Sequence, residues 1–374
     1  MTLKFIEIKI PKDVLKGYLE AKFGRPIEIK EYKRIGTGWH ATGYRIRFIV
    51  SGEEKTIILK TLRPEGFSHD FASDRAGVFL LQHELAQRVK NHISSYDVGG
   101  YTEEGKILSL SSCKEFFHIV EVAKGRRYLE DLKRLMKENS LKEEDKNIAL
   151  MISDYLIRLH QEKFYPEGIN DEHKEAIARS IYRRNLRDCI GHGEMTLGVI
   201  DTYPDDVSWT TPEELTDIIT KSFDLKERLK GNFRRLCRIH GDFHPGNILL
   251  EDGNVRVMDA SRFLHGEPAN DVVCLTLNYV WYAIQQTGRF EGVFKKLAEL
   301  FWNNYVEKTK DDGIEKIAPL YTAYLYTVMA HSLFFPDQTD DVRKKLFAII
   351  KGVFSDGRLY LTRINTYVDK VESK

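Results

Sequence analysis

The apolar residues of this chain recur with two different periods, and the change between them divides the sequence into two parts. In the first part the spacing is close to two, which is typical of half-buried strands. Five segments are predicted to be strands: 27–35, 44–50, 56–62, 106–110 and 116–122. Helices are predicted at 12–23 and 76–93. Residues 1–122 are therefore expected to form an α+β lobe with one five-stranded antiparallel sheet.

From residue 123 onward the apolar residues recur every three to four positions, which places them on one face of a helix. Helices are predicted at 128–137, at 143–161 and throughout 271–368. Residues 123–374 are therefore expected to form a larger, mainly helical lobe. Between residues 164 and 235, charged residues, Gly and Pro weaken the pattern, and two helical patches remain, at 173–186 and 212–221. A stretch of this kind is typical of a lid or binding element inserted into a core fold.

Composition supports a folded protein with two lobes. The chain has 374 residues, of which 42% are hydrophobic, enough to bury a sizeable core. Lys and Arg number 57 against 56 Asp and Glu, and this balance argues against a nucleic-acid partner bound by broad phosphate neutralisation. No apolar run reaches the roughly 20 residues that cross a bilayer, so no membrane partner is expected.

The N-terminus lacks the uninterrupted apolar segment of a signal peptide, and the four cysteines form no C-x-x-C pair. We therefore expect a cytoplasmic protein.

The most informative segment is HGDFHPGNIL at 240–249, followed by VRVMD at 255–259. It places Asn247 five residues after Asp242 and puts Asp259 at the end of a second short strand. Phosphoryl transfer requires an aligned acceptor hydroxyl and divalent metal to neutralise charge. Asp242 is suited to accept the hydroxyl proton, and Asn247 and Asp259 offer the oxygen ligands that Mg²⁺ prefers.

Three motifs together, HGDFHPGNIL, VMDAS and GEPANDV, resemble those of the aminoglycoside phosphotransferase and choline kinase family of kinase-like enzymes. The resemblance covers the order of elements from about residue 27 to 335. It implies a protein-kinase-like bilobal fold with ATP and Mg²⁺ between the lobes. By this resemblance Asp242 is the catalytic base, and Asn247 and Asp259 hold Mg²⁺.

The same resemblance implies a set of nucleotide-binding residues: Gly36, Gly38, Lys60, Glu84, Glu121 and Ala123. Lys60, in the segment IILK, would contact the ATP phosphates, and Glu84 on the following helix would pair with it. The glycine turn from Gly36 would cover the phosphates. Residues 121 and 123 would meet the adenine through backbone atoms at the hinge.

Three positions depart from the family pattern. The metal-binding Asp259 is followed by Ala260 where the family usually has Phe, and metal binding needs only the Asp. The usual Gly-Asp-Pro has Glu267 at its centre. Ala41 stands where a third glycine would complete a protein-kinase phosphate loop. No Ala-Pro-Glu follows Asp259, which favours a small-molecule acceptor over a protein.

Two other motifs suggest chemistry but fit it poorly. The segment GYTEEGK at 100–106 matches a phosphate-binding loop, yet it lacks the Ser or Thr that would reach Mg²⁺. We interpret it as a hairpin turn. Cys189, His192 and Glu194 are close enough in sequence to share a metal, but three mixed ligands are weak evidence.

His240 and His244 flank Asp242 and are expected to orient the loop. Asp271 is expected to cap the next helix and tie it to that loop.

The sequence therefore indicates an enzyme, a small-molecule kinase that transfers the γ-phosphoryl group of ATP to a hydroxyl. Its acceptor would be an aminoglycoside, an amino alcohol or a sugar. An acidic run from Asp201 to Glu214 could attract a cationic acceptor, although the arginines between 179 and 187 could equally neutralise it. Two alternatives stay open: a nucleotide-binding pseudokinase with a regulatory role, and a protein or lipid kinase.

Overall fold

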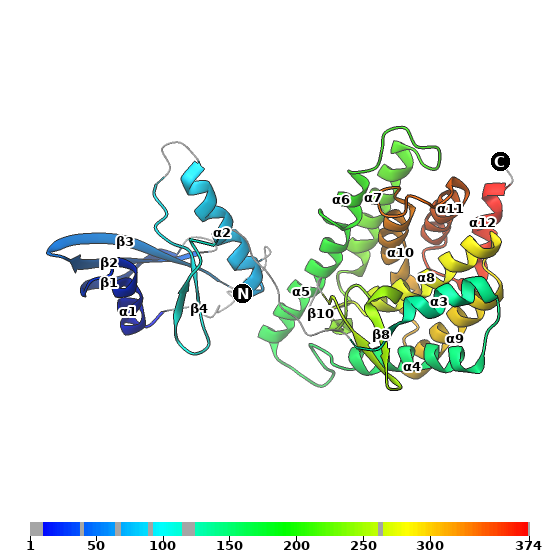
Figure 1. The fold of residues 1–374 in the computed structure, drawn as a ribbon, viewed down its shortest axis with the longest axis horizontal. Helices are drawn as coiled ribbons and strands as arrows, with labels where there is room; N and C mark the ends of the chain where they lie inside the picture. The colour runs from blue at the N-terminus through cyan, green and yellow to red at the C-terminus, as the bar shows by residue number, and fades with distance from the viewer. Residues whose placement is uncertain are drawn as a thin grey trace. The chain divides into compact units, whose positions relative to one another are not determined.

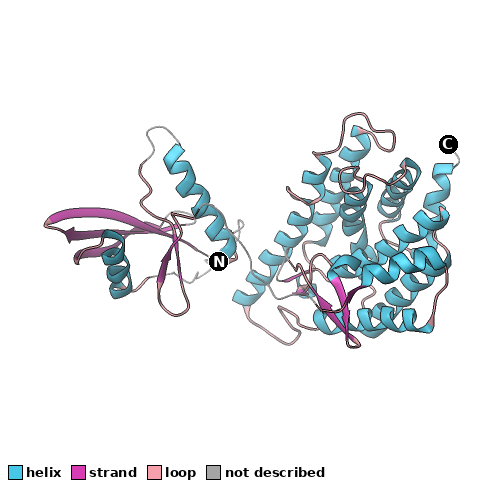
Figure 2. Cartoon of the chain, in the orientation of Figure 1, coloured by secondary structure: helices cyan, strands magenta, loops and turns pink. Residues whose placement is uncertain are grey.

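The computed structural model describes residues 10–37, 41–63, 69–88, 93–113, 124–260 and 265–372. The chain divides into two compact units, Met1–Val120 (unit 1) and Glu121–Lys374 (unit 2). The longest strands belong to unit 1, whereas helices make up most of unit 2 (Figures 1 and 2). The expected α+β class, with helices in the majority, is confirmed.

Unit 1 contains a three-stranded antiparallel sheet in the order β1 (Ile27–Thr37), β2 (Ala41–Val50) and β3 (Glu53–Leu62). Alternate residues of β2, from Tyr44 to Val50, are buried. Helix α1 (Lys12–Phe23) supplies Leu15 and Leu19 to the same small core. The alternating apolar pattern therefore places one face of β2 toward the core.

The predicted single five-stranded sheet is wrong for the residues that the structure describes. Strand β5 (Ile107–Ser109) pairs with β4 (Gly99–Tyr101) in a separate two-stranded sheet. The segment GYTEEGK supplies the end of β4 and the turn, with Gly105 at φ 78°, as expected for a hairpin. Strand β4 was not predicted because Gly-Gly-Tyr shows no apolar alternation. The fifth predicted strand, 116–122, lies outside the described residues.

Side-chain contacts attach this hairpin to α1. Asp97, just before β4, accepts hydrogen bonds from the hydroxyls of Tyr18 and Ser109 and pairs with Lys22 Nζ at 2.8 Å. These bonds hold the pKa of Asp97 well below its usual range, although burial acts in the opposite direction. The remaining element of unit 1 is helix α2 (Ala72–Arg88).

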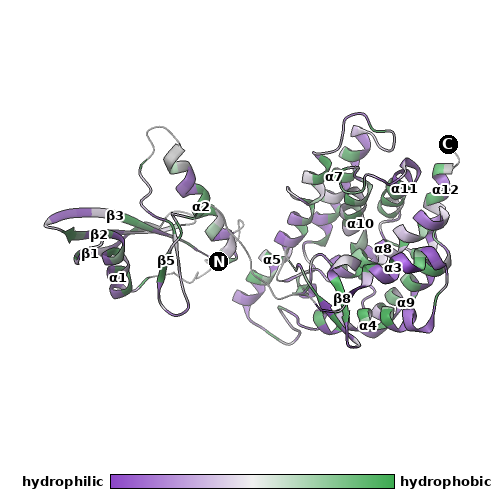
Figure 3. Ribbon diagram, viewed as in Figure 1, coloured by the Kyte–Doolittle hydropathy of each residue, from purple (hydrophilic) through white to green (hydrophobic). Residues whose placement is uncertain are grey.

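Unit 2 consists mainly of helices. They are α3 (Tyr128–Glu138), α4 (Glu143–His160), α5 (Glu172–Ile190), α6 (Thr196–Ile200), α7 (Pro212–Leu229), α8 (Ala269–Thr287), α9 (Gly292–Thr309), α10 (Ile314–Ala330), α11 (Asp340–Asp356) and α12 (Ile364–Glu372). Short 3₁₀ turns occur at η1 (Phe233–Arg235), η2 (Pro245–Asn247) and η3 (Leu361–Arg363). Helix α8 is buried from Ala269 to Ile284 and packs against α9 and α10. The helices around it carry both hydrophobic and hydrophilic residues along their length (Figure 3).

Two small sheets complete unit 2. Strand β8 (Ile248–Glu251) lies between β6 (Arg126–Arg127) and β9 (Asn254–Val257). The turn from β8 to β9 contains only Asp252 and Gly253, both at positive φ, which suits a two-residue hairpin. Strand β7 (Cys237–Arg238) pairs with β10 (His265–Gly266).

Much of the segment 164–235 is packed into the core of unit 2. Its helices α5, α6 and α7 contribute buried side chains to the main core, including Tyr182, Leu186 and Ile218, and they contact α10. The charged residues of α5, such as Arg183 and Arg187, lie on its exposed side. They obscured the apolar period in the sequence because they occupy most positions between the buried residues.

Within the ranges described above, no helix is both long and apolar enough to span a membrane.

Candidate active site

The motif at 240–249 forms the loop that leads from β7 into η2 and β8. Gly241 has φ 88°, a backbone conformation that favours glycine because it has no Cβ. The His244 amide donates to the Asp242 carbonyl at 2.9 Å, and the Asn247 amide donates to the His244 carbonyl at 3.0 Å. The loop is therefore tightly folded, and it carries Asp242 half-buried at its head.

Asp271 anchors this loop from the first turn of α8. Its carboxylate is fully buried and accepts the backbone amides of His240 at 2.7 Å and Gly241 at 2.8 Å. The expected tie between Asp271 and the loop is therefore present. Asp271 does not cap its own helix, because it lies inside α8 and its oxygens are turned toward the loop.

His160, at the end of α4, extends this anchor into the core. Its Nε2 lies 3.2 Å from Asp271 Oδ2 and its Nδ1 lies 2.7 Å from the Tyr305 hydroxyl. A carboxylate only accepts, so Nε2 carries the proton and Nδ1 accepts from Tyr305. Burial raises the pKa of Tyr305 well above its usual value, which keeps this hydroxyl a donor.

His240 orients the loop, as expected. Its Nδ1 accepts the Asp242 amide at 3.2 Å, so its Nε2 donates to the Met258 carbonyl at 2.9 Å. Both ring nitrogens are thus engaged by backbone groups. His240 also joins the head of the loop to the residue that precedes Asp259.

The structure brings Asp242, Asn247 and the start of the Asp259 segment together. Asn247 Nδ2 donates to the Asp242 carbonyl at 3.0 Å, and the Asn247 carbonyl accepts the Met258 amide at 3.1 Å. Asp259 itself is exposed and has φ 59°. A left-handed conformation is uncommon for a non-glycine residue, although Asp adopts it more readily than most.

The donor set of this loop fits a hard divalent cation. The bond from Asn247 Nδ2 fixes the amide and leaves its oxygen Oδ1 on the other side, while Asp259 contributes an exposed carboxylate. One or two protein oxygens completed by substrate phosphates and water are typical of Mg²⁺ sites. A cluster of three or more His, Cys, Asp or Glu able to hold a metal does not occur among the described residues. The structure therefore gives no support to a site at Cys189, His192 and Glu194.

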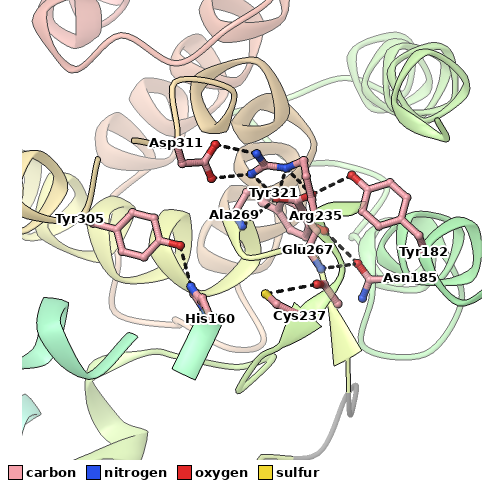
Figure 4. A network of polar contacts seen from close by, with 11 residues as sticks. His160, Tyr182, Asn185, Arg235, Cys237, Glu267, Ala269, Tyr305, Asp311 and Tyr321 are labelled. Carbon is pink, nitrogen blue, oxygen red and sulfur yellow. Dashed lines mark hydrogen bonds and ion pairs between the residues drawn. The ribbon is translucent and has the colours of Figure 1, made fainter. Parts of the chain in front are cut away.

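A second polar network, which the sequence did not reveal, lies between the helices of unit 2 (Figure 4). Glu267 is fully buried and accepts two Arg235 nitrogens, at 2.7 and 2.9 Å, and the Tyr182 hydroxyl at 2.7 Å. Arg235 also donates to Asp311 at 2.6 Å. Burial alone would lower the pKa of Arg235, but Glu267 and Asp311 raise it well above its usual value. Glu267 directly follows β10, so this buried network of ion pairs joins the end of β10 to Arg235 and Asp311.

In unit 1, Lys60 lines a pocket of about 390 Å³. Gly36, Gly43 and Lys60 occupy one row across β1, β2 and β3, because Gly43 is paired with each of the other two. Gly43 lines the pocket together with Lys60. Phe79 and Gln82 of α2 contribute to the wall of the pocket.

The other residues expected to bind nucleotide are not all placed. Glu84 is exposed on α2 and is not among the residues that line the pocket, so its pairing with Lys60 stays a prediction. Gly38, Glu121 and Ala123 lie outside the described residues.

Comparison with known proteins supports the interpretation of the loop. The model of the phosphotransferase enzyme family matches residues 203–302. The resemblance to this family is therefore confirmed. The matched segment contains the loop with Asp242 and Asn247, the hairpin that ends at Asp259, and Asp271 with the whole of α8. No curated protein matches the chain.

Solved structures of small-molecule kinases are also similar to the chain. An amicoumacin kinase in complex with AMP-PNP, Ca²⁺ and Ami is 15% identical, covers 90% of this chain and 92% of its own, and has a TM-score of 0.40. A choline kinase from Cryptosporidium parvum Iowa II is 13% identical, with coverage of 97% and 96% and a TM-score of 0.31. A glucosamine kinase is 12% identical, with coverage of 93% and 94% and a TM-score of 0.34.

Residues 203–302, which match the family model, thus include the residues whose hydrogen bonds define the loop. The sequence motif located Asp242, Asn247 and Asp259, but it gave no sign of the Arg235 and Glu267 network. The only available signal was Glu267 itself, an acidic residue where the family has Asp. Arg235 lies 32 residues upstream, and its partner could not be chosen among the neighbouring arginines.

Proposed function

We propose that this protein is an ATP-dependent, Mg²⁺-dependent kinase of protein-kinase-like fold that phosphorylates a hydroxyl group of a small molecule. The observation that carries the proposal is the set of hydrogen bonds from Asn247 to the Asp242 carbonyl and to Met258. These bonds fix the proposed base and one proposed metal ligand in a single loop and hold that loop beside the Asp259 segment. The match of residues 203–302 to the phosphotransferase enzyme family supports the same reaction class.

Asp242 is the general base in this proposal. Its carboxylate takes the proton from the acceptor hydroxyl as the hydroxyl oxygen forms a bond to the γ-phosphorus. The bond from the γ-phosphorus to the bridging oxygen breaks, and ADP leaves with that electron pair. Phosphoryl transfer depends mainly on positioning and charge stabilisation, which is why the anchoring of the loop by Asp271 and His240 matters.

Asn247 and Asp259 would hold Mg²⁺ through Asn247 Oδ1 and the Asp259 carboxylate. Bound Mg²⁺ supplies positive charge that offsets the charge developing on the phosphate oxygens. The chain's contribution is the fixed orientation of the Asn247 amide and the turn at Asp259. The bond to the Asp242 carbonyl orients the Asn247 amide before any ligand binds.

The nucleotide-binding role of unit 1 belongs to the same proposal. Lys60 would contact the phosphates, and the glycine turn from Gly36 would cover them. We extend the proposal to Gly38, Glu84, Glu121 and Ala123 in the roles that the family resemblance implies.

The acidic run does not lie beside the loop. The Tyr203 hydroxyl donates to the Thr327 carbonyl near the end of α10, whereas Asp311, just before α10, joins the Arg235 and Glu267 network. Helix α10 has 17 residues, a length of about 25 Å. The run is therefore well separated from the loop and does not by itself select a cationic acceptor.

The test is phosphate transfer from γ-labelled MgATP to pools of amino alcohols, sugars and aminoglycosides. We expect a labelled product in one pool only when Mg²⁺ and an acceptor are both present. Matched reactions without acceptor or with the metal chelated should give none. Binding of MgATP with no labelled product in any pool would contradict the proposal and favour the pseudokinase.

A further inference from the structure

A second pocket lies in unit 2 beside the segment 331–339, which joins α10 to α11. Its volume is about 450 Å³, within the range of small-molecule sites. It is lined mainly by apolar and aromatic side chains, with a few polar groups at its edge. The residues used below are Met136, Trp281, Phe334, Phe335, Asp337 and Gln338.

Buried hydrogen bonds hold the rim of this pocket in place. Arg343 is 2% exposed, and its guanidinium donates to the carbonyls of Ala330, at 2.5 Å, and Phe335, at 2.6 Å. Trp281 Nε1 donates to Gln338 Oε1 at 2.5 Å. The segment is therefore preorganised, and a ligand would not have to order it.

The walls of the pocket are aromatic. The ring centroids of Trp281 and Phe335 lie 5.2 Å apart in an edge-to-face arrangement. Phe334 is 46% exposed, so a large part of its side chain is accessible at the rim. Aromatic faces attract apolar groups and cations alike.

A carboxylate at the rim adds a negative charge to this aromatic lining. Asp337 is exposed and lines the pocket. Within the described residues its side chain has no ion pair or hydrogen bond. A carboxylate beside aromatic faces favours a positively charged group over a neutral or negative one.

This pocket is separate from the loop that carries Asp242. Asp271, which binds the loop, and Trp281, which lines the pocket, are ten residues apart on the continuous helix α8. At the rise of an α-helix this separation is about 15 Å. Neither Asp242 nor any other residue of the loop lines the pocket.

We propose that this pocket is a second ligand site that binds an amphipathic organic cation, an apolar or aromatic frame carrying one protonated or quaternary amine. The frame packs against the aromatic and apolar lining formed by Trp281, Phe335 and Met136, and the amine lies near the exposed Phe334 ring and the Asp337 carboxylate. The site does not depend on the proposed kinase activity, because none of its residues belongs to the loop.

The test compares three soluble probes with the same ring: benzyltrimethylammonium, benzyl alcohol and phenylacetate. Dissociation constants of the full-length protein are measured by ligand-detected NMR titration without nucleotide. We expect saturable binding of benzyltrimethylammonium and at least roughly three-fold weaker binding of the other two, as for a partly exposed cation beside aromatic and acidic groups. Equal binding of the alcohol, or no saturable binding of the cation, would overturn the proposal.

Two variants locate the bound cation. Asp337→Asn and Phe334→Ala change exposed side chains, so both proteins should unfold at the wild-type temperature. Each should weaken benzyltrimethylammonium binding by roughly three-fold. The matched control is Asp224→Asn, which removes an exposed carboxylate from α7 and should bind as wild type does. Wild-type binding by both pocket variants would show that the cation binds elsewhere and would refute the site.

Discussion

Single residues of unit 2 have protonation states set by their neighbours. His331 is 1% exposed; its Nδ1 accepts the Leu333 amide at 3.0 Å, and its Nε2 lies 3.3 Å from Thr202 Oγ1. Burial lowers the pKa of His331 from 6.5, and nearby Arg343 acts in the same direction, while the contact with Thr202 opposes them. The folded protein therefore holds this histidine neutral, and a proton on Nδ1 would face the Leu333 N–H.

This shift predicts a pH dependence of stability. Between the folded and unfolded pKa values, the unfolded chain binds more protons than the folded chain, so the free energy of unfolding rises with pH. Stability should fall as the pH drops below about 6.5, with a slope of at most about 1.4 kcal/mol per pH unit from this residue. His331→Gln should flatten the urea-unfolding profile, whereas the exposed His173→Gln should leave it unchanged. The same acid slope in wild type and His331→Gln would rule out this assignment.

At the scale of elements, α8 connects the core to the loop. It is buried over most of its length, and Asp271 in its first turn accepts the amides of His240 and Gly241. Loop position is thus coupled to the packing of a core helix. This coupling adds an anchor in the core to the hydrogen bonds that the loop residues make with each other.

Asp271→Asn tests this coupling. The amide has one acceptor oxygen and turns a donor toward the loop, so one buried N–H loses its partner, a cost of about 1–3 kcal/mol in unfolding free energy. Displacement of the loop should also lower kcat by roughly 10²-fold and leave the KM for MgATP nearly unchanged. Urea unfolding and steady-state kinetics measure the two effects, with the exposed Asp312→Asn as control. A stability loss with wild-type kcat would show that Asp271 does not position the loop.

The sequence predicted elements well where apolar periodicity is strong. Helix α1 begins and ends at the predicted residues, 12 and 23, and the three long strands of unit 1 were each located. The hairpin turn between β4 and β5 was predicted, but β4 itself was missed because Gly-Gly-Tyr shows no apolar alternation. The helices of 164–235 were underestimated because burial against α10, rather than local pattern, holds them in the core.

In the candidate site, too, the features that depend on local sequence were predicted, and those that depend on distant contacts were not. Asp242, Asn247 and Asp259 were found from the sequence because their spacing is local. The partners that hold them were harder to find, since His160 and Tyr305 are 145 residues apart and meet only through packing. The direction of the Asp271 carboxylate likewise depends on the folded loop.

At the scale of the whole molecule, the proposal assigns nucleotide binding to the small unit with the three-stranded sheet. It assigns the base and the metal ligands to the larger helical unit. Unit 1 contributes a pocket with Lys60, and unit 2 contributes the loop with Asp242 and Asn247. The pocket beside 331–339 lies in the same unit as the loop but at another part of α8. Unit 2 thus carries two features that can be tested independently.

The central claim is that Asp242 removes the acceptor proton in a phosphoryl transfer. The most direct measurement is the transfer rate from MgATP for Asp242→Asn and wild type, with MgATP affinity measured on the same samples. Asp252→Asn, in the exposed β8–β9 turn, is the matched control and should equal wild type. We predict a loss of at least ~10²-fold in rate with unchanged MgATP affinity for Asp242→Asn. A transfer rate equal to wild type in that variant would contradict the account.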